Sequence, residues 1–208
     1  MATIRREAIT AWTYAVGVSR CYAPAYRYIV ADIGVERGAW LDVGCGPGRL
    51  CVEAARGRPE LDVVGIDREP AALRVAEGVR AGMLNVTLRT MDAAKIVYPE
   101  HTFDVVTAVQ SAHHWADTDA ILAEIWRVLR PGGRLFLYEA DPEVTIPAEW
   151  VARRFGFPPD AALRLAWRRH GMDGPRWDAL RARVASSPFG EDASDERHGF
   201  YRRLVCTR

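Results

Sequence analysis

The chain has 208 residues, 49% of them hydrophobic and 26% charged, and a formal net charge of +1 at pH 7. This length suffices for one domain with a full core, and the composition excludes a disordered or fibrous protein. A net charge near zero argues against a nucleic-acid partner. No apolar run approaches the roughly 20 residues of a membrane span, and charged residues interrupt the beginning of the chain where a signal peptide needs an apolar centre. We expect a single soluble, cytoplasmic domain.

The cysteines give no sign of a disulfide framework or a metal site. Cys21, Cys45, Cys51 and Cys206 include no CxxC motif and no histidine at metal-ligand spacing. We therefore expect reduced thiols and no bound metal.

The first 38 residues are predicted to be helical and are rich in aromatic side chains. These aromatic residues are Trp12, Tyr14, Tyr22, Tyr26 and Tyr28. Their number and their position before the regular pattern described next suggest a helical lid.

Residues 39–140 alternate short β-type runs with helical patterns, which is typical of βαβ units and a parallel sheet. The predicted strands are residues 39–43, 62–67, 86–90, 103–109 and 134–139. The pattern predicts an α/β fold, a Rossmann-like doubly wound sheet with helices on both faces.

Helical periodicity fills the gaps between these strands. Apolar residues recur at helical spacing in residues 69–83 and 117–129, and residues 49–57 are also predicted to be helical. Pro70 suits a helix start, and Pro131-Gly132-Gly133 suits a helix end.

The remainder of the chain departs from this alternation. Residues 143–185 are predicted to form two or three helices, broken at GFPPD and GMDGP, and residues 199–208 a last strand. We expect one domain over 1–208, with residues 1–38 as lid, 39–141 as cofactor-binding core and 142–208 as substrate-side helices and closing strand.

The stretch WLDVGCGPGRL places three glycines directly after the first predicted strand. Ligands of open parallel sheets bind at the carboxyl ends of the strands. Gly44, Gly46 and Gly48 would permit a tight turn there and let a ligand approach the backbone. The loop therefore suits a ligand with an anionic or carboxylate end, facing the start of the next helix.

An acid at the end of the second strand indicates which ligand. Asp67 follows Gly44 by 23 residues and is placed to accept hydrogen bonds from ribose hydroxyls. The third glycine comes one position too early for the G-x-G-x-x-G dinucleotide fingerprint. Asp42 would repel a pyrophosphate but is compatible with a cofactor that carries an amino group. These features favour a nucleoside cofactor other than NAD.

LDVGCGPG resembles motif I of the class I S-adenosylmethionine-dependent methyltransferases, and the likeness continues in order over about residues 35–141. VVGID, ending in Asp67, resembles their ribose-binding acid, and Asp92 their acid near the adenine amino group. IWRVLRPGGRLFLYEAD resembles the helix, Pro-Gly-Gly turn and fifth strand of the small-molecule branch that includes ubiquinone and menaquinone methyltransferases. The resemblance implies seven strands with the last one antiparallel, and S-adenosyl-L-methionine as cofactor.

The resemblance also implies a set of site residues. The expected cofactor-binding residues are Asp42, Gly44, Cys45, Gly46, Gly48, Asp67, Arg68, Met91, Asp92, Ala93 and Gln110. Tyr14, Tyr22 and Trp115 are candidates for an aromatic wall near the sulfonium, and Glu139 is a candidate for the substrate pocket.

His113 and His114 follow the fourth strand and are the candidates for a general base, because histidine titrates near neutral pH. Carbon, oxygen, nitrogen and sulfur acceptors share this cofactor site, so the sequence leaves the acceptor atom open, and it also leaves the oligomeric state open. A small or lipid-like acceptor is the preferred interpretation.

Three alternatives stay open. The arginines between residues 153 and 183 would suit an RNA or protein substrate, although VQSAHHW lacks the Pro-Pro and aromatic motif of amino-group methylation. A cofactor-binding module without catalysis and an NAD-dependent oxidoreductase are the other two.

Overall fold

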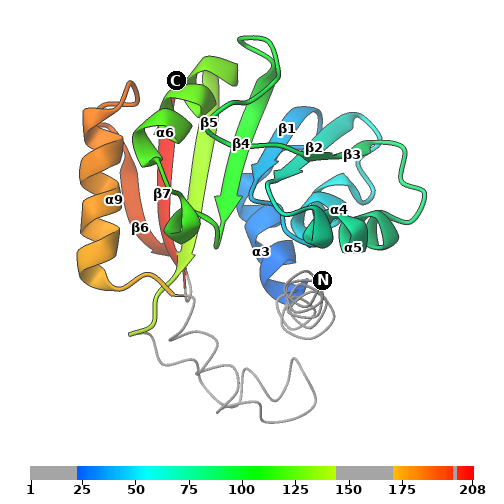
Figure 1. Ribbon diagram of the computed structural model, residues 1–208, viewed down its shortest axis with the longest axis horizontal. Helices are drawn as coiled ribbons and strands as arrows, with labels where there is room; N and C mark the ends of the chain where they lie inside the picture. Colours follow the sequence, from blue (N-terminus) through cyan, green and yellow to red (C-terminus); the bar gives the residue numbers. More distant parts are fainter. Residues whose placement is uncertain (1–22, 144–170, 199–200) are drawn as a thin grey trace, which may run out of the picture.

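The computed structural model describes residues 23–143, 171–198 and 201–208. A central sheet in these ranges lies between two layers of helices (Figure 1). Tyr14 and Tyr22, most of the expected lid, and the arginines from Arg153 to Arg169 lie outside the described residues.

The described residues form a seven-stranded sheet with the order β3-β2-β1-β4-β5-β7-β6. The strands are β1 Gly38–Val43, β2 Leu61–Asp67, β3 Val86–Thr90, β4 Phe103–Val109, β5 Leu129–Ala140, β6 Ser194–His198 and β7 Tyr201–Thr207. The first five strands pair in parallel, and β7 runs antiparallel to both β5 and β6. The predicted Rossmann-like sheet with an antiparallel last strand is confirmed.

Helices cover both faces of this sheet. They are α3 Ala23–Ile33, α4 Arg49–Ala55, α5 Pro70–Arg80, the 3-10 turn η2 Ala112–His114, α6 Thr118–Val128 and α9 Gly174–Ser186. Side chains cap several helix starts: Glu69 accepts the Ala71 N–H at α5, and Asp117 accepts the Ala120 N–H at α6. Within the described ranges, no helix combines the length and apolar character needed to cross a bilayer.

The pleat of the strands divides the interior into two cores. Trp40 packs on the face covered by α3, α4 and α5, whereas its neighbour Leu41 packs on the face covered by α6 and α9. Val105 and Val106 in β4 divide in the same way. Successive strand residues are buried on opposite faces, as expected for a sheet covered on both sides.

The order of the strands reverses between β1 and β4, which is where ligands bind in such sheets. The ends of these two strands approach closely. A Cβ atom on Gly44 would lie 2.5 Å from the Ser111 Cβ, and the Ser111 hydroxyl donates to the Val43 carbonyl over 2.7 Å. Gly44 is therefore required by the crossing of the strands as well as by its positive φ of 73°.

A partly buried ion pair attaches α3 to the sheet. Arg203 on β7 donates to both oxygens of Asp32 on α3, at 2.8 and 2.7 Å, and the Tyr138 hydroxyl on β5 also donates to Asp32. Burial raises the pKa of Tyr138, so this phenol stays a donor. The contact fixes the helix that carries Tyr26.

Two strands differ from the sequence prediction, β5 in where it begins and β6 in its location. β5 begins at Leu129, one residue after α6 ends, so that Pro131-Gly132-Gly133 lies within the strand. Leu129 pairs with Phe103, and the Arg208 N–H donates to the Gly133 carbonyl. The resemblance implies seven strands, but the sequence did not locate β6, because its sequence SDERH has no apolar residue to reveal a strand.

Gly65 gives a test of this packing. Its Cβ would lie 2.8 Å from the Cys51 Sγ and 2.9 Å from the Cys45 Sγ. We expect Gly65→Ala to lower the free energy of unfolding by about 1–3 kcal/mol through overpacking, measured by urea denaturation. Gly78 on α5 faces open space, so Gly78→Ala should raise stability by about 0.5–1 kcal/mol. Equal effects of the two substitutions would contradict this account.

Candidate functional site

A cavity of about 850 Å³ lies at the carboxyl edge of the sheet. The glycine-rich loop after β1, the end of β2, the segment after β3 and the segment after β4 all contribute to its lining. The volume is within the range of small-molecule and cofactor sites. Four separate parts of the chain therefore meet around one space.

The glycine-rich loop is held by the acid at the end of β2. The Gly46 N–H donates to Asp67 Oδ2 over 2.8 Å, and the Glu69 N–H donates to Asp67 Oδ1, also over 2.8 Å. Gly46 has a φ of 51°, and a Cβ there would meet no atom within 4 Å. The loop thus presents bare backbone to open space, while Asp67 keeps further lone pairs for a ligand.

Asp42 lies behind the loop, 3% exposed. Its Oδ1 accepts the Thr107 hydroxyl over 2.8 Å, its Oδ2 accepts the Cys51 thiol over 3.5 Å, and the Trp40 indole N–H donates to Thr107 over 2.8 Å. Burial raises the pKa of Asp42 from 3.8 to about 7. This acid ties the end of β1 to β4 and α4 and does not line the cavity.

The segment after β3 forms a second wall. The Met91 N–H donates to the Asp67 carbonyl over 3.0 Å. Asp92 is exposed, and its Oδ1 accepts the Ala94 N–H over 2.9 Å, which closes a tight turn. Met91, Asp92 and Ala93 all line the cavity.

The segment after β4 forms the third wall. Gln110 adopts a left-handed φ of 52°, unusual for a residue other than glycine, and its N–H donates to the Tyr138 carbonyl over 2.7 Å. Backbone conformations of this kind gather at functional sites. The turn directs the chain into η2, which carries both histidines.

A buried carboxylate orients His113. Glu139 on β5 is fully buried, and its Oε2 lies 2.9 Å from His113 Nδ1. Its Oε1 accepts the His113 backbone N–H over 3.2 Å. With Nδ1–H directed to Glu139, Nε2 is the ring nitrogen that can accept a proton.

Aromatic and imidazole rings complete the lining. His114 is exposed, and its ring centroid lies 4.0 Å from that of His113. Trp115 and Tyr26 also border the cavity. The arrangement combines a backbone cradle, two acids and an oriented imidazole, which together can hold a polar nucleoside and remove a proton from a second molecule.

Residues 41–137 match a family model described as "Methyltransferase domain". A demethylmenaquinone methyltransferase of Deinococcus radiodurans is 35% identical over 139 residues, which are 58% of this chain and 57% of that protein. Nocamycin O-methyltransferase of Saccharothrix syringae is 41% identical over 155 residues, 72% of this chain and 53% of that protein. Residues 41–137 therefore form a methyltransferase domain similar to those of the class I S-adenosylmethionine-dependent methyltransferases.

Solved structures share the fold of this methyltransferase domain. A protein of Methanococcus maripaludis assigned to the S-adenosyl-L-methionine-dependent methyltransferases superposes with a TM-score of 0.79 at 15% identity, covering 97% of this chain and 93% of that one. Human N-acetylserotonin methyltransferase gives a TM-score of 0.71 at 16% identity, covering 99% and 57%. The chain spans just over half the length of the two curated relatives named above.

Most residues expected in the site of this methyltransferase domain meet at the cavity. Those lining it are Gly44, Cys45, Gly46, Asp67, Arg68, Met91, Asp92, Ala93, Gln110, His113, His114 and Trp115. Asp42, Gly48 and Glu139 lie behind the lining; Gly48 begins α4, where a Cβ would come within 3.0 Å of the Ala76 Cβ. Glu139 was expected in the pocket itself and instead contacts it through His113.

Sequence reasoning missed two features of the lining. Tyr26 was noticed only as one of several aromatic residues, and its place on α3 gave no sign of the cavity. Ser111 follows Gln110 and was not expected in the lining, although a small polar residue opposite a glycine is a signal for the close strand crossing. In the part of the chain that the structure describes, no group of three or more His, Cys, Asp and Glu side chains could hold a metal ion.

The raised pKa of Asp42 predicts a pH dependence of stability. Folding takes up a proton between the unfolded pKa near 3.8 and the folded pKa of about 7, so the contribution of Asp42 to stability falls as pH rises through this window. The free energy of unfolding of the wild type, minus that of Asp42→Asn, should therefore decline from about pH 4 to pH 7 and level off above. Urea denaturation across this range measures the difference.

A matched control is Asp62→Asn, which changes an exposed acid on the same strand as Asp67. This variant should follow the wild-type pH curve. Parallel curves for the wild type and Asp42→Asn would contradict the assignment of a high pKa to Asp42.

Proposed function

We propose that the chain binds S-adenosyl-L-methionine and transfers its methyl group to a small or lipid-like acceptor. The observation that carries the proposal is that one cavity brings together the glycine-rich loop, Asp67 and the His113 ring. The methyltransferase domain over residues 41–137 supports it.

The residues fit the cofactor. Gly46 exposes its backbone to open space, where a Cβ would meet no atom within 4 Å. Asp67 retains acceptor capacity for ribose hydroxyls, and Asp92 lies exposed on the cavity wall, where an adenine amino group could be received. Gly44 and Gln110 line the same cavity and would hold the methionine end.

When bound, S-adenosyl-L-methionine supplies an electrophilic methyl group on a positively charged sulfur. The contribution of the chain is mostly geometric, because aligned reactants gain several kcal/mol. Tyr26 and Trp115 offer aromatic faces that attract a cation without pairing with it.

His113 is the proposed proton acceptor. Glu139 holds its Nδ1 side over 2.9 Å, so Nε2 would take the proton from an acceptor hydroxyl or amine. Glu139 is a positioning residue in this scheme, since it does not line the cavity. His114, on the same turn, is the second candidate for the role.

The names of the relatives suggest the chemical class of the acceptor. They include demethylmenaquinone, nocamycin O- and fatty-acid O-methyltransferases. We infer an acceptor of this small or lipid-like kind.

The described basic residues of α9 support a small acceptor over RNA. Arg181 binds Asp195 over 2.8 Å, Arg183 pairs with Asp119, and Arg176 donates to the His113 carbonyl over 3.3 Å. Cations engaged in this way contribute little to a phosphate-binding surface.

Calorimetry tests the cofactor. We expect wild-type protein to bind S-adenosylhomocysteine and not NAD, and Asp67→Ala to bind at least roughly tenfold more weakly, since it loses charge-assisted hydrogen bonds. Asp62→Ala, which removes an exposed acid on the same strand, should bind like wild type. Binding of NAD alone, or of neither ligand, would refute the proposal.

Turnover tests the acceptor and the base. We would assay reduced demethylmenaquinone, a long-chain fatty acid and a simple phenol with S-adenosyl-L-methionine. With an oxygen or nitrogen acceptor that the enzyme methylates, His113→Ala should lower kcat by about 10²-fold or more. Glu139→Gln should shift the pH profile of kcat.

His101→Asn changes an exposed histidine outside the cavity and should leave kcat unchanged. Unchanged kcat in His113→Ala would exclude His113 as the base, and cofactor binding without turnover of any acceptor class would favour a non-catalytic module.

A further inference from the structure

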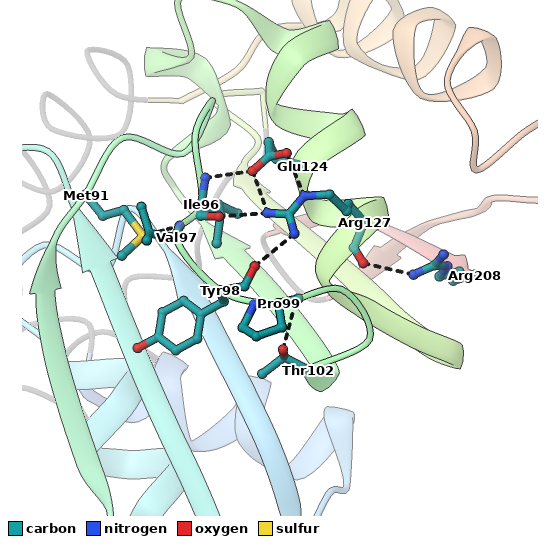
Figure 2. Close-up of polar contacts among 9 residues, drawn as sticks. All are labelled: Met91, Ile96, Val97, Tyr98, Pro99, Thr102, Glu124, Arg127 and Arg208. Atoms are coloured by element: carbon teal, nitrogen blue, oxygen red, sulfur yellow. Dashed lines mark hydrogen bonds and ion pairs between the residues drawn. The ribbon is translucent and has the colours of Figure 1, made fainter.

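The segment between β3 and β4 is fastened to α6 by two side chains that lie outside the cavity. Figure 2 shows Glu124 and Arg127 of α6 reaching the backbone of residues 96–98. Neither side chain lines the cavity, whereas residues 91–94 of the same segment do. The segment therefore joins a cavity wall at one end to an anchor at the other.

The anchor is a set of charge-assisted hydrogen bonds. Arg127 Nη2 donates to the Ile96 carbonyl over 2.7 Å, and Nη1 donates to the Tyr98 carbonyl over 2.8 Å. Glu124 Oε2 accepts the Ile96 N–H over 2.8 Å. Both backbone groups of Ile96 are thus bound by α6, and bonds to ionised groups are the strong class.

The two side chains also hold each other. Arg127 Nε lies 2.8 Å from Glu124 Oε1, and Nη2 lies 2.8 Å from Oε2. The hydrogen bonds from Arg127 lower the pKa of Glu124 below its ordinary value. The pair is therefore charged and rigid, and further fixed where Arg208 donates to the Arg127 carbonyl over 3.0 Å (Figure 2).

Rigid contacts carry this anchor to the cavity wall. The Ile96 side chain is 3% exposed in the core beneath α6. The Val97 N–H donates to the Met91 sulfur over 3.3 Å, and the Lys95 N–H donates to the Asp92 carbonyl over 3.0 Å. Only Lys95 separates the anchored Ile96 from Ala94, which lines the cavity.

We propose that Arg127 and Glu124 are positioning residues for the nucleoside side of the cofactor, setting the place of Met91, Asp92 and Ala93 from outside the cavity. The inference rests on the proposed function and deepens it. A wall that must be ordered on binding weakens affinity, whereas a wall already fixed does not. Because Asp92 is the proposed partner of the adenine amino group, the anchor also supports discrimination between adenine and hypoxanthine.

A second arginine, Arg80, makes the same kind of contacts and gives a matched control. Arg80 pairs with Glu77 three residues earlier on α5 and donates to the Met83 and Val86 carbonyls over 3.3 and 3.2 Å. It thus fastens the connection that precedes β3, and none of these residues lines the cavity. Arg80→Met removes the same charge and the same kind of anchor without touching the proposed wall.

The experiment measures S-adenosylhomocysteine and S-inosylhomocysteine binding by calorimetry in wild type, Arg127→Met and Arg80→Met. We expect Arg127→Met to bind S-adenosylhomocysteine roughly tenfold more weakly, the loss associated with re-ordering a few backbone residues. Its preference for the adenine ligand should shrink by several fold. Arg80→Met should keep both the affinity and the preference within about twofold of wild type.

Two further variants keep the test open if Arg127→Met does not fold. Arg127→Lys retains the charge but lacks the planar fork whose separate nitrogens reach two carbonyls and Glu124. Glu124→Gln retains an acceptor for Ile96 but loses the ion pair. Both should weaken the preference for adenine in the same direction. Wild-type affinity in these variants would overturn the inference. An equal loss for both ligands, with the preference unchanged, would also overturn it by showing a merely structural role. Failure of wild-type protein to bind S-adenosylhomocysteine would instead count against the proposed function.

Discussion

The close approach of β1 and β4 at the point where the strand order reverses is the constraint on which the site depends. Ser111 stands where a side chain on Gly44 would have to be, and its hydroxyl closes the contact through the Val43 carbonyl. With the two strand ends locked in this way, the loop after β1 must turn sharply toward β2, where Asp67 receives the Gly46 N–H. The segment after β4 must likewise leave the sheet through the left-handed Gln110. The glycine-rich loop after β1 and the His113 imidazole after β4 face one cavity because both follow directly from this strand crossing.

Around the crossing, buried acids fix the parts of the site from behind. Asp42 ties the end of β1 to Thr107 on β4 and Cys51 on α4, on either side of the glycine-rich loop, and Glu139 orients His113. On the second wall, formed by the segment after β3, the Glu124–Arg127 ion pair on α6 has the corresponding place. In each case a group outside the lining determines the position of groups inside it, which is how a cavity can stay open to ligand and still be preorganised.

Much of this could be predicted from sequence, for local reasons. Apolar runs revealed the parallel strands because both faces of the sheet are buried, and the spacing from Gly44 to Asp67 revealed the cofactor edge because both end neighbouring strands. β6 could not be predicted, because its five residues carry no apolar alternation. The role of Glu139 could not be predicted either, since it lies 26 residues from His113 and only the pairing of β4 with β5 brings them together. The boundary at Leu129 was misplaced because its burial suits a helix face and a strand equally.

The charged β6 has a consequence for the behaviour of the protein in concentrated solution. It forms one edge of the sheet, where unpaired backbone groups invite another strand to add. Asp195, Glu196 and Arg197 are all exposed along this edge, so an approaching strand would have to strip water from closely spaced charges of both signs. A sheet that ends in this way resists edge-to-edge aggregation, and the protection comes from the same lack of apolar residues that concealed the strand.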